Sequence, residues 1–363
     1  MVLATETGRP QSGLGCLDGL VLGDGMVEAA GWLLHPDTAI DAVGLRIDGT
    51  GIGQGAVGER PDVAATFPSV PHAGRSAFRV RGAFAPARAD ALLRVESFGL
   101  ARGRVVVTAE EYWPADGVPA VPTPEAAMME RVSAGRDADW FNRAGLGIAA
   151  QLLAAVRRHL PQEVAVPRLL DWGSGPARAT RFMPLLWPGL FPVGCDIDAA
   201  AIAWCRAHVP GGIFHATDPF PPLPYPDAAF DAVVAASVMT HLTWPVQRRW
   251  LAEIRRVLAP GGVFVASVHG PLAALPLPGA ERATLARDGL LDGTRDDRLD
   301  GIAPAGYYRA TYQTEAFTRA QWGRVLTVRE YVAGGLGNWQ DLVVLRRDAG
   351  AWGRGLAGVL GRR

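Results

Sequence analysis

The sequence lacks net charge, paired cysteines and long apolar runs, and each absence excludes a class of protein. Lys and Arg together number 36, as do Asp and Glu, so the 363 residues carry no net charge. Nucleic-acid binding therefore has no electrostatic support, because phosphate contacts need clustered basic side chains. The three cysteines, Cys16, Cys195 and Cys205, have neither metal-ligand nor disulfide spacing. We expect no metal site and a reducing compartment.

Membrane and export signals are also missing. No apolar stretch reaches the roughly twenty residues that a membrane-spanning helix needs. Residues 1–8 lack the basic-then-apolar pattern of a secretory leader. We therefore expect a cytoplasmic protein. The chain is longer than one typical domain, which favours at least two, and its oligomeric state stays open.

Residues 1–112 predict a small domain built only of strands. Apolar and polar residues alternate from Val43 to Asp48, which buries one face of a strand, and Asp48-Gly49 then offers a hairpin turn. Similar runs, separated by Gly, Pro and Asp, cover 17–22, 26–34, 51–57, 77–83, 91–98 and 104–108. About seven strands of this kind predict a β-sandwich.

A proline-rich linker, residues 113–126, separates this domain from a second one at 127–348. Four prolines should keep the linker extended and semi-rigid, so that the two domains fold separately. Helical spacing covers 139–159, where Trp140 and Phe141 either form a lid or pack on the sheet. Further on we expect an irregular segment at 270–314, a helix at 315–325, strands at 326–332 and 339–346, and a tight turn at 334–337. The Gly-rich, basic tail 349–363 should be flexible.

The most informative stretch is 168–177, where an apolar strand ends in Asp171 and turns at once through Gly173 and Gly175. Glycine is needed where the backbone takes conformations closed to other residues and approaches a ligand closely. A dinucleotide site would have a third glycine where Arg178 stands, and Asp171 would repel a pyrophosphate. A ligand with a sulfonium and an ammonium group, and no phosphate, suits this acidic strand end.

Later strands follow in a recognisable order. A second strand ends in Asp196, roughly twenty residues beyond the glycine turn. Residues 213–218 and 230–237 indicate a third and a fourth, and 250–262 a helix and turn before a fifth. These ordered motifs resemble class I S-adenosylmethionine-dependent methyltransferases. The resemblance implies an α/β, Rossmann-like mixed sheet of seven strands whose last strand is antiparallel, with S-adenosylmethionine as cofactor.

The same resemblance assigns the cofactor site. Asp196 would accept hydrogen bonds from both ribose hydroxyls, and Ile197 would pack on the adenine. Asp218 either lies near the adenine or starts a turn, and Ser237 either contacts the cofactor or ends its strand. Asp198 should cap the next helix. The residues expected to bind the cofactor are Asp171, Gly173, Gly175, Asp196, Ile197, Asp218 and Ser237.

Two histidines follow strands and are therefore candidates for the catalytic base, since ligands bind at the carboxyl ends of such strands. An imidazole can accept a hydroxyl proton near neutral pH, and the resemblance favours His241 over His269. His241 could equally be a wall of the pocket. Tyr307, Tyr308 and Tyr312 either stack on a sugar or pack a lid. Gln340 and Asp341 either face the cleft or satisfy backbone groups.

The acceptor is the least determined part of the prediction. Gly31-Trp32, Asp48-Gly49 and residues 59–63 resemble the β-sandwich domains attached to bacterial glycosyltransferases and surface-polysaccharide enzymes. Together with His241, this predicts O-methylation of a hydroxyl on a sugar or surface glycan. N- or C-methylation of a small molecule stays open, because the cofactor motifs do not depend on the acceptor. A glycan- or partner-binding module with an inactive methyltransferase domain is the non-enzymatic alternative.

Overall fold

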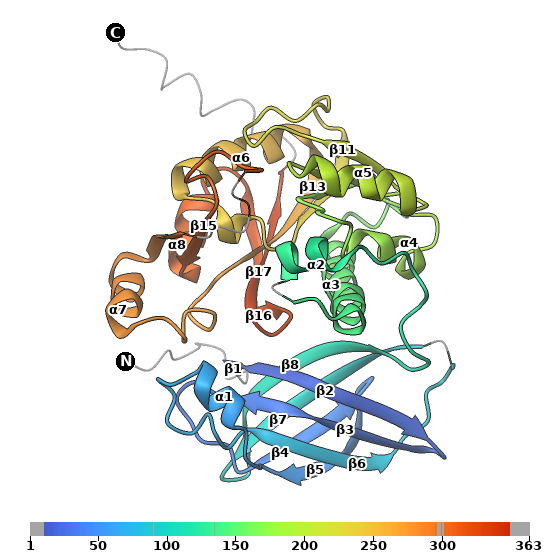
Figure 1. Ribbon diagram of the computed structural model, residues 1–363, viewed down its shortest axis with the longest axis vertical. Helices are drawn as coiled ribbons and strands as arrows, with labels where there is room; N and C mark the ends of the chain where they lie inside the picture. Colours follow the sequence, from blue (N-terminus) through green and yellow to red (C-terminus); the bar gives the residue numbers. More distant parts are fainter. Residues whose placement is uncertain (1–10, 90, 134, 296–298, 300, 349–363) are drawn as a thin grey trace.

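The computed structural model describes residues 11–348 apart from 90, 134, 296–298 and 300. A β domain comes first, and an α/β domain follows it along the chain (Figure 1). The tail predicted to be flexible, residues 349–363, lies outside the described residues. In the described part of the chain, no helix combines the length and the apolar character needed to cross a membrane.

The β domain is a sandwich of two sheets around a shared core. Val43, Leu45 and Ile47 on one strand are fully buried, as their alternation predicts. The expected all-β fold is confirmed, with a short helix, α1 (Pro61–Thr66), added to it. One sheet has the order β1 (Gln11–Ser12), β8 (Arg104–Pro114), β7 (Leu92–Ala101), β4 (Ala42–Ile47), β5 (Thr50–Ala56), and the other has β2 (Leu14–Gly23), β3 (Met26–Leu34), β6 (Ala77–Ala83).

A seven-stranded sheet forms the centre of the α/β domain and confirms the predicted mixed topology. The strands run parallel except β17, which is antiparallel to both of its neighbours. The carboxyl ends of the parallel strands therefore share one edge, where ligands bind in open α/β sheets. The order is β11 (Ile213–Ala216), β10 (Val193–Asp196), β9 (Leu169–Trp172), β12 (Phe230–Ala235), β13 (Leu258–Val268), β17 (Gln340–Arg346), β16 (Thr327–Leu336).

Helices cover both faces of this sheet because neighbouring strand residues point to opposite sides. Leu169 packs with α3 (Ala138–His159) and α4 (Met183–Leu186), whereas Leu170 packs with α6 (Trp244–Val257). On α3, Phe141 is fully buried while Trp140 stays 36% exposed, so the packing interpretation applies to Phe141. Asp198 caps α5 (Ala199–His208), as predicted, by accepting hydrogen bonds from the backbone N–H of Ala200 and Ala201 at 3.0 and 3.1 Å.

The segment 270–314 is not irregular, and that prediction was wrong. It contains α7 (Gly279–Asp288) and the antiparallel pair β14 (Leu290–Arg295) and β15 (Arg309–Gln313). Helix α7 buries Leu285 alone, so it has no apolar periodicity to read. The tight turn expected at 334–337 is also displaced: β16 continues to Leu336, and the turn falls at Gly337–Asn338, where both residues have positive φ.

The proline-rich linker packs against the second domain. Val118 and Val121 contact the apolar cluster that includes α3. Arg181 donates a hydrogen bond to the carbonyl of Pro122 at 2.6 Å. Helix α2 (Ala126–Ser133) follows and brings the chain to the carboxyl edge of the sheet, where it contacts the glycine turn.

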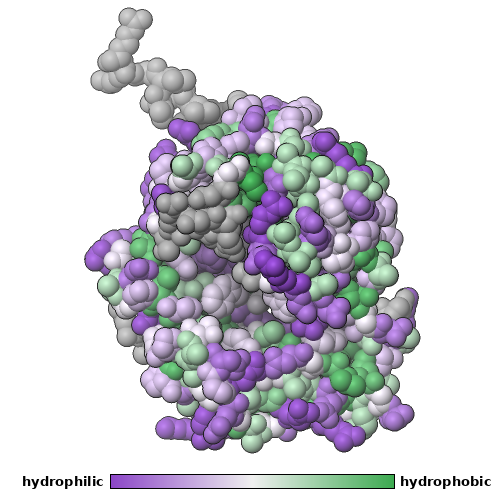
Figure 2. All heavy atoms as spheres, viewed as in Figure 1, coloured by the Kyte–Doolittle hydropathy of each residue, from purple (hydrophilic) through white to green (hydrophobic). Residues whose placement is uncertain are grey.

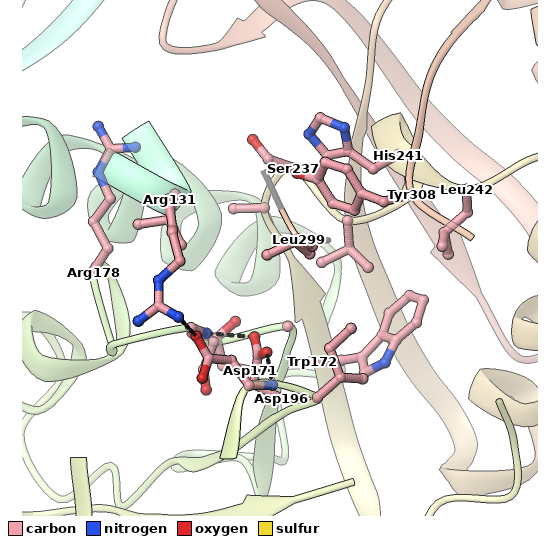
Figure 3. Close-up of a pocket in the computed structure, with 18 of the residues that line it drawn as sticks. Arg131, Asp171, Trp172, Arg178, Asp196, Ser237, His241, Leu242, Leu299 and Tyr308 are labelled. Atoms are coloured by element: carbon pink, nitrogen blue, oxygen red, sulfur yellow. Dashed lines mark hydrogen bonds and ion pairs between the residues drawn. The ribbon is translucent and has the colours of Figure 1, made fainter. Parts of the chain in front are cut away.

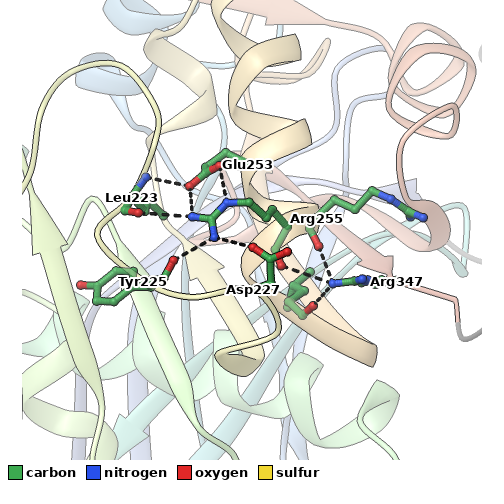
Figure 4. A network of polar contacts seen from close by, with 8 residues as sticks. Leu223, Tyr225, Asp227, Glu253, Arg255 and Arg347 are labelled. Atoms are coloured by element: carbon green, nitrogen blue, oxygen red, sulfur yellow. Dashed lines mark hydrogen bonds and ion pairs between the residues drawn. The ribbon is translucent and has the colours of Figure 1, made fainter. Parts of the chain in front are cut away.

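A polar network fixes the Pro-rich segment between β11 and β12 to the end of α6 (Figure 4). Arg256 bonds Glu253 at 2.6 Å, Asp227 at 2.8 Å and the carbonyl of Tyr225 at 2.8 Å. Glu253 in turn accepts a hydrogen bond from the backbone N–H of Leu223 at 2.7 Å.

On the face seen in Figure 2, hydrophilic and hydrophobic residues are interspersed over both domains.

Candidate active site

A cavity of about 400 Å³ lies at the carboxyl edge of the parallel strands. Its walls come from the segments that follow β9, β10, β12 and β13, from α2 and from the turn between β16 and β17. Figure 3 shows part of this lining, with Arg131 of α2, Asp171, Asp196 and His241 labelled. Eight predicted site residues line it: Asp171, Gly173, Gly175, Asp196, Ile197, Ser237, His241 and His269.

The glycine turn after β9 has the backbone conformation that its sequence requires. Gly173 and Gly175 have φ values of +79° and +51°, in the region that favours glycine. A Cβ on Gly173 would lie 2.3 Å from Cγ2 of Val238, so this glycine also allows the turn to meet the segment after β12. Ala177 takes φ +56° at the end of the same turn. The turn thus presents backbone close to the cavity.

Two carboxylates flank this turn, the buried Asp171 and the half-buried Asp196. Asp196 accepts hydrogen bonds from the backbone N–H groups of Gly175 at 2.7 Å and of Asp198 at 2.8 Å, which ties the glycine turn to the end of β10. Burial raises the pKa of Asp196. Asp171 accepts a hydrogen bond from the Thr180 hydroxyl. Burial raises the pKa of Asp171 to about 6, opposed by the Thr180 hydrogen bond and reinforced by the charge of Asp196.

Arg178 brings a positive charge to the same cavity. From the sequence, this residue was considered only as a mismatch to a dinucleotide motif. Its guanidinium lies 4.9 Å from the ring centroid of Trp140 and 5.3 Å from that of Phe141. Burial lowers the pKa of Arg178 to about 10. Among the described residues its buried Nε has no hydrogen-bond partner. In Figure 3 the side chain points away from Asp171 and Asp196.

The two histidines meet on the opposite wall. His241 lies on a single 3-10 turn, Met239–His241, and stacks on Tyr308 with ring centroids 4.1 Å apart. His269 follows β13 and stacks on Tyr312 at 5.0 Å. The two imidazoles approach edge to face at 5.8 Å. Residues separated by 28 positions in the sequence therefore form one cluster on the cavity wall.

Ser237 occupies a strained position between the two walls. It has φ +58°, a conformation that costs energy for a residue with a side chain and that is concentrated at functional sites. Its N–H donates to Oγ of Ser267 at 2.8 Å, and its own Oγ accepts a hydrogen bond from Nε2 of Gln340 at 2.8 Å. Of the pair Gln340 and Asp341, the first faces the cavity. Asp341 is buried and accepts from the hydroxyl of Tyr331 at 2.6 Å.

Other candidates lie elsewhere. Asp218 is exposed and, among the described residues, does not line the cavity; Thr217 lines it instead. Tyr307 is buried, and its hydroxyl accepts a hydrogen bond from Nε1 of Trp250 on α6 at 3.2 Å, while Tyr307 and Tyr308 both border the cavity. The described residues contain no group of three or more His, Cys, Asp or Glu side chains that could hold a metal ion.

The chain is similar to known methyltransferases. The family of methyltransferase domains matches residues 170–266. A probable S-adenosylmethionine-dependent methyltransferase from Mycolicibacterium smegmatis is 40% identical over 85 residues, which are 23% of this chain and 32% of that protein. The chain thus spans about a third of the length of this curated relative.

The solved structures to which the chain is similar are more distant in sequence. An S-adenosylmethionine-dependent methyltransferase from Mesorhizobium loti is 19% identical, with a TM-score of 0.39, over 54% of this chain and 98% of that one. The 1,6-didemethyltoxoflavin-N1-methyltransferase of Burkholderia thailandensis is 17% identical, with a TM-score of 0.41, over 70% of this chain and 96% of that one. At such TM-scores neither structure bears on the acceptor.

The sheet order, the glycine turn between two carboxylates and the family match at residues 170–266 agree with one another. Residues 170–266 therefore match the family of methyltransferase domains, and they lie in a sheet with the Rossmann-like order of the class I fold.

Proposed function

We propose that this protein is an enzyme that transfers the methyl group of S-adenosylmethionine to a hydroxyl group, on a sugar or a surface glycan. The observation that carries the proposal is the meeting of His241 and His269 on the same cavity as the glycine turn. A hydroxyl acceptor must lose a proton during transfer, and an imidazole is the side chain best suited to take it near neutral pH.

The side chains at the proposed cofactor end of the cavity support S-adenosylmethionine as the ligand by their charge and polarity. The free lone pairs of the Asp196 carboxylate can accept hydrogen bonds from a ribose diol, and Ile197 can cover the adenine. Asp171 offers negative charge to the ammonium and sulfonium groups, and Arg178 offers a buried cation to the carboxylate of the amino-acid part. When bound, S-adenosylmethionine supplies a methyl group that is already activated.

The protein's remaining tasks are to align the acceptor, exclude water and remove a proton. We assign proton removal to His241, which is 7% exposed and whose ring is held by the stacked Tyr308. His269 stands beside it as the second candidate. Ser237 and Gln340 bond each other at the border between the cofactor end and the histidine end, where they can align an acceptor hydroxyl.

Label transfer tests the proposal. The full chain is incubated with methyl-labelled S-adenosylmethionine and a panel of hexose glycosides, small alcohols, phenols and amines, and the labelled products are separated. We expect label in an ether-linked methyl group on a glycoside or alcohol. Label on an amine or carbon atom would contradict O-methylation while keeping the methyltransferase. Cofactor binding without transfer to any member would favour the binding module.

A further inference from the structure

One apolar cluster joins the β-sandwich to the α/β domain. Phe67, directly after α1, is 2% exposed, and its ring centroid lies 6.0 Å from that of Trp32 on β3 and 6.0 Å from that of Trp339. Leu272, from the segment that follows His269, is buried in the same cluster. The sandwich therefore packs on two segments of the catalytic domain that border the cavity.

Hydrogen bonds fix the turn between β16 and β17 in the same place. The N–H of Glu110 on β8 donates to Oδ1 of Asn338 at 3.0 Å, and the N–H of Gly337 donates to Oε1 of Gln151 on α3 at 3.0 Å. A further bond runs from the Ser69 hydroxyl to the carbonyl of Leu275 at 3.0 Å. Figure 1 shows this hairpin directed at the sandwich. The turn is thus held from the sandwich by the Glu110 bond and by the packing of Phe67 on Trp339, and from α3 by the Gln151 bond.

This turn contributes directly to the cavity. Trp339 and Gln340, the two residues after Asn338, both line it. Gln340 bonds the strained Ser237, which lies between the cofactor end and the histidines. Because β17 is antiparallel, it begins at the edge where the parallel strands end, so its first residues lie beside the acceptor position. A continuous series of contacts runs from Phe67 and Glu110 to Ser237.

We propose that the β-sandwich is a working part of the acceptor site, because it positions the wall formed by Trp339 and Gln340. This rests on the proposed methyl transfer. Phe67 and Asn338 are positioning residues, whereas Trp339 and Gln340 touch the acceptor. The contacts that join Phe67 and Glu110 to the turn do not include the glycine turn or Asp196 at the proposed cofactor end. Loosening the wall should therefore change acceptor binding and leave cofactor binding intact.

Two matched variants of the full chain test this. Phe67→Leu removes the ring that packs on Trp339, and Phe78→Leu makes the same change in the sandwich core, where Phe78 is 4% exposed and outside the shared cluster. Hydrogen exchange needs no acceptor. In Phe67→Leu we expect amides 337–341 and 237 to exchange about tenfold faster or more, with β9 and β10 unchanged. Phe78→Leu should leave 337–341 unchanged.

Kinetics with the fastest acceptor of the label-transfer panel completes the test. Phe67→Leu should raise the acceptor KM by about fivefold or more, with kcat and the S-adenosylhomocysteine Kd within about twofold of the parent. Asn338→Gly should do the same, because it keeps the left-handed backbone and removes the amide. Asn338→Asp should keep the acceptor KM, the kcat and the S-adenosylhomocysteine Kd of the parent, since it keeps an oxygen acceptor.

Unchanged exchange at 337–341 in Phe67→Leu would overturn the link between the domains. Faster exchange with an unchanged acceptor KM would show that the turn does not border the acceptor. A parent protein that binds no S-adenosylhomocysteine would instead refute the proposed function, and the exchange result would still decide whether the sandwich holds the turn.

Discussion

The two ends of the cavity are built in different ways. The end that we propose for the cofactor comes mainly from one stretch, residues 171–198, in which Asp196 bonds the backbone of the glycine turn directly, and α2 adds Arg131 and Val132 to it. The acceptor end combines His241, His269, Tyr308 and Trp339, which lie far apart in the sequence, and the sandwich packs behind it. Backbone conformation fixes the first end, and tertiary packing fixes the second.

This difference teaches which substitutions should have separate effects. A change at the cofactor end should alter affinity for S-adenosylmethionine and for its product, and only a change at Asp171 should affect the sulfonium-bearing cofactor more than the product. A change at the acceptor end should alter turnover or acceptor binding with little effect on the cofactor. Each prediction below would weaken the comparison if its effect appeared at the wrong end.

The largest effect should come from His241→Ala. Turnover should fall by at least about a hundredfold, the lower range for a positioned general base, while the S-adenosylhomocysteine Kd stays within a few-fold of the parent. Initial rates with the identified acceptor, together with calorimetric titration, measure both quantities. His269→Ala is the control and should reduce turnover less. Near-normal turnover in His241→Ala would mean that the enzyme accelerates the reaction by aligning the cofactor and the acceptor, and it would favour an acceptor that needs no base.

Asp196→Ala should produce the largest change at the cofactor end. Loss of two charge-assisted hydrogen bonds should weaken S-adenosylmethionine binding by roughly 2–4 kcal/mol. Asp196→Asn keeps one oxygen and should lose less. The fold should survive in both, which the melting temperature checks. An affinity change below about threefold would remove Asp196 from the cofactor site.

Arg178→Gln should separate the amino-acid part of the cofactor from its nucleoside. One charge-assisted contact contributes about 1.5–3 kcal/mol, so affinity for S-adenosylhomocysteine should fall about tenfold or more. Affinity for 5′-methylthioadenosine, which lacks the amino-acid part, should not change. If both ligands are weakened equally, Arg178 acts on the turn and not on a carboxylate. If neither is weakened, its charge faces the acceptor, and the acceptor KM should then rise.

The smallest effect should come from pH. Burial raises the pKa of Asp171 to about 6, so in the ligand-free protein this carboxyl takes up a proton as the pH falls through 6. Affinity for the cationic cofactor should therefore fall below pH 6, by up to about tenfold per pH unit. Asp171→Asn should remove this dependence. A parent affinity that stays constant from pH 7 to 5 would contradict a role for the Asp171 charge.

The raised pKa of Asp171 also makes the stability of the folded protein depend on pH. The folded-state pKa lies above the unfolded value, so the group stabilises the ligand-free protein most below about pH 4. That contribution is lost as the pH rises through about 6. A saturating cofactor should oppose the loss, because it favours the charged form of Asp171. The melting temperatures measured with and without the cofactor should therefore differ more at pH 7 than at pH 4.5.

Sequence alone brought together the residues of the proposed cofactor end because they are local. Asp171, the glycine turn and Asp196 follow one another within 26 residues, and positive φ at Gly173 and Gly175 is a property of glycine itself. The sheet order followed from the same motifs. Arg178 was missed although it stands three residues after Gly175, because a cation there was judged only against a dinucleotide motif. Its position beside the turn was the available signal.

The acceptor end was predicted only in part, because its contacts link distant segments. The positions of His241 and His269 after strands were legible, but their stacking on Tyr308 and Tyr312 depends on β14 and β15, which pair across an insertion predicted to be irregular. No local pattern indicated that Trp339 meets Phe67, 272 positions earlier. Asp218 is the opposite case: its position in the sequence suits a cofactor contact, but its side chain is exposed.

Calorimetric titration of the full chain with S-adenosylmethionine tests the central claim most directly, namely that the cavity beside the glycine turn is a cofactor site. We predict saturable binding of one molecule per chain, competed by S-adenosylhomocysteine and strongly weakened by Asp196→Ala. Absence of saturable heat at millimolar cofactor, with a melting temperature that the cofactor does not change, would contradict the account.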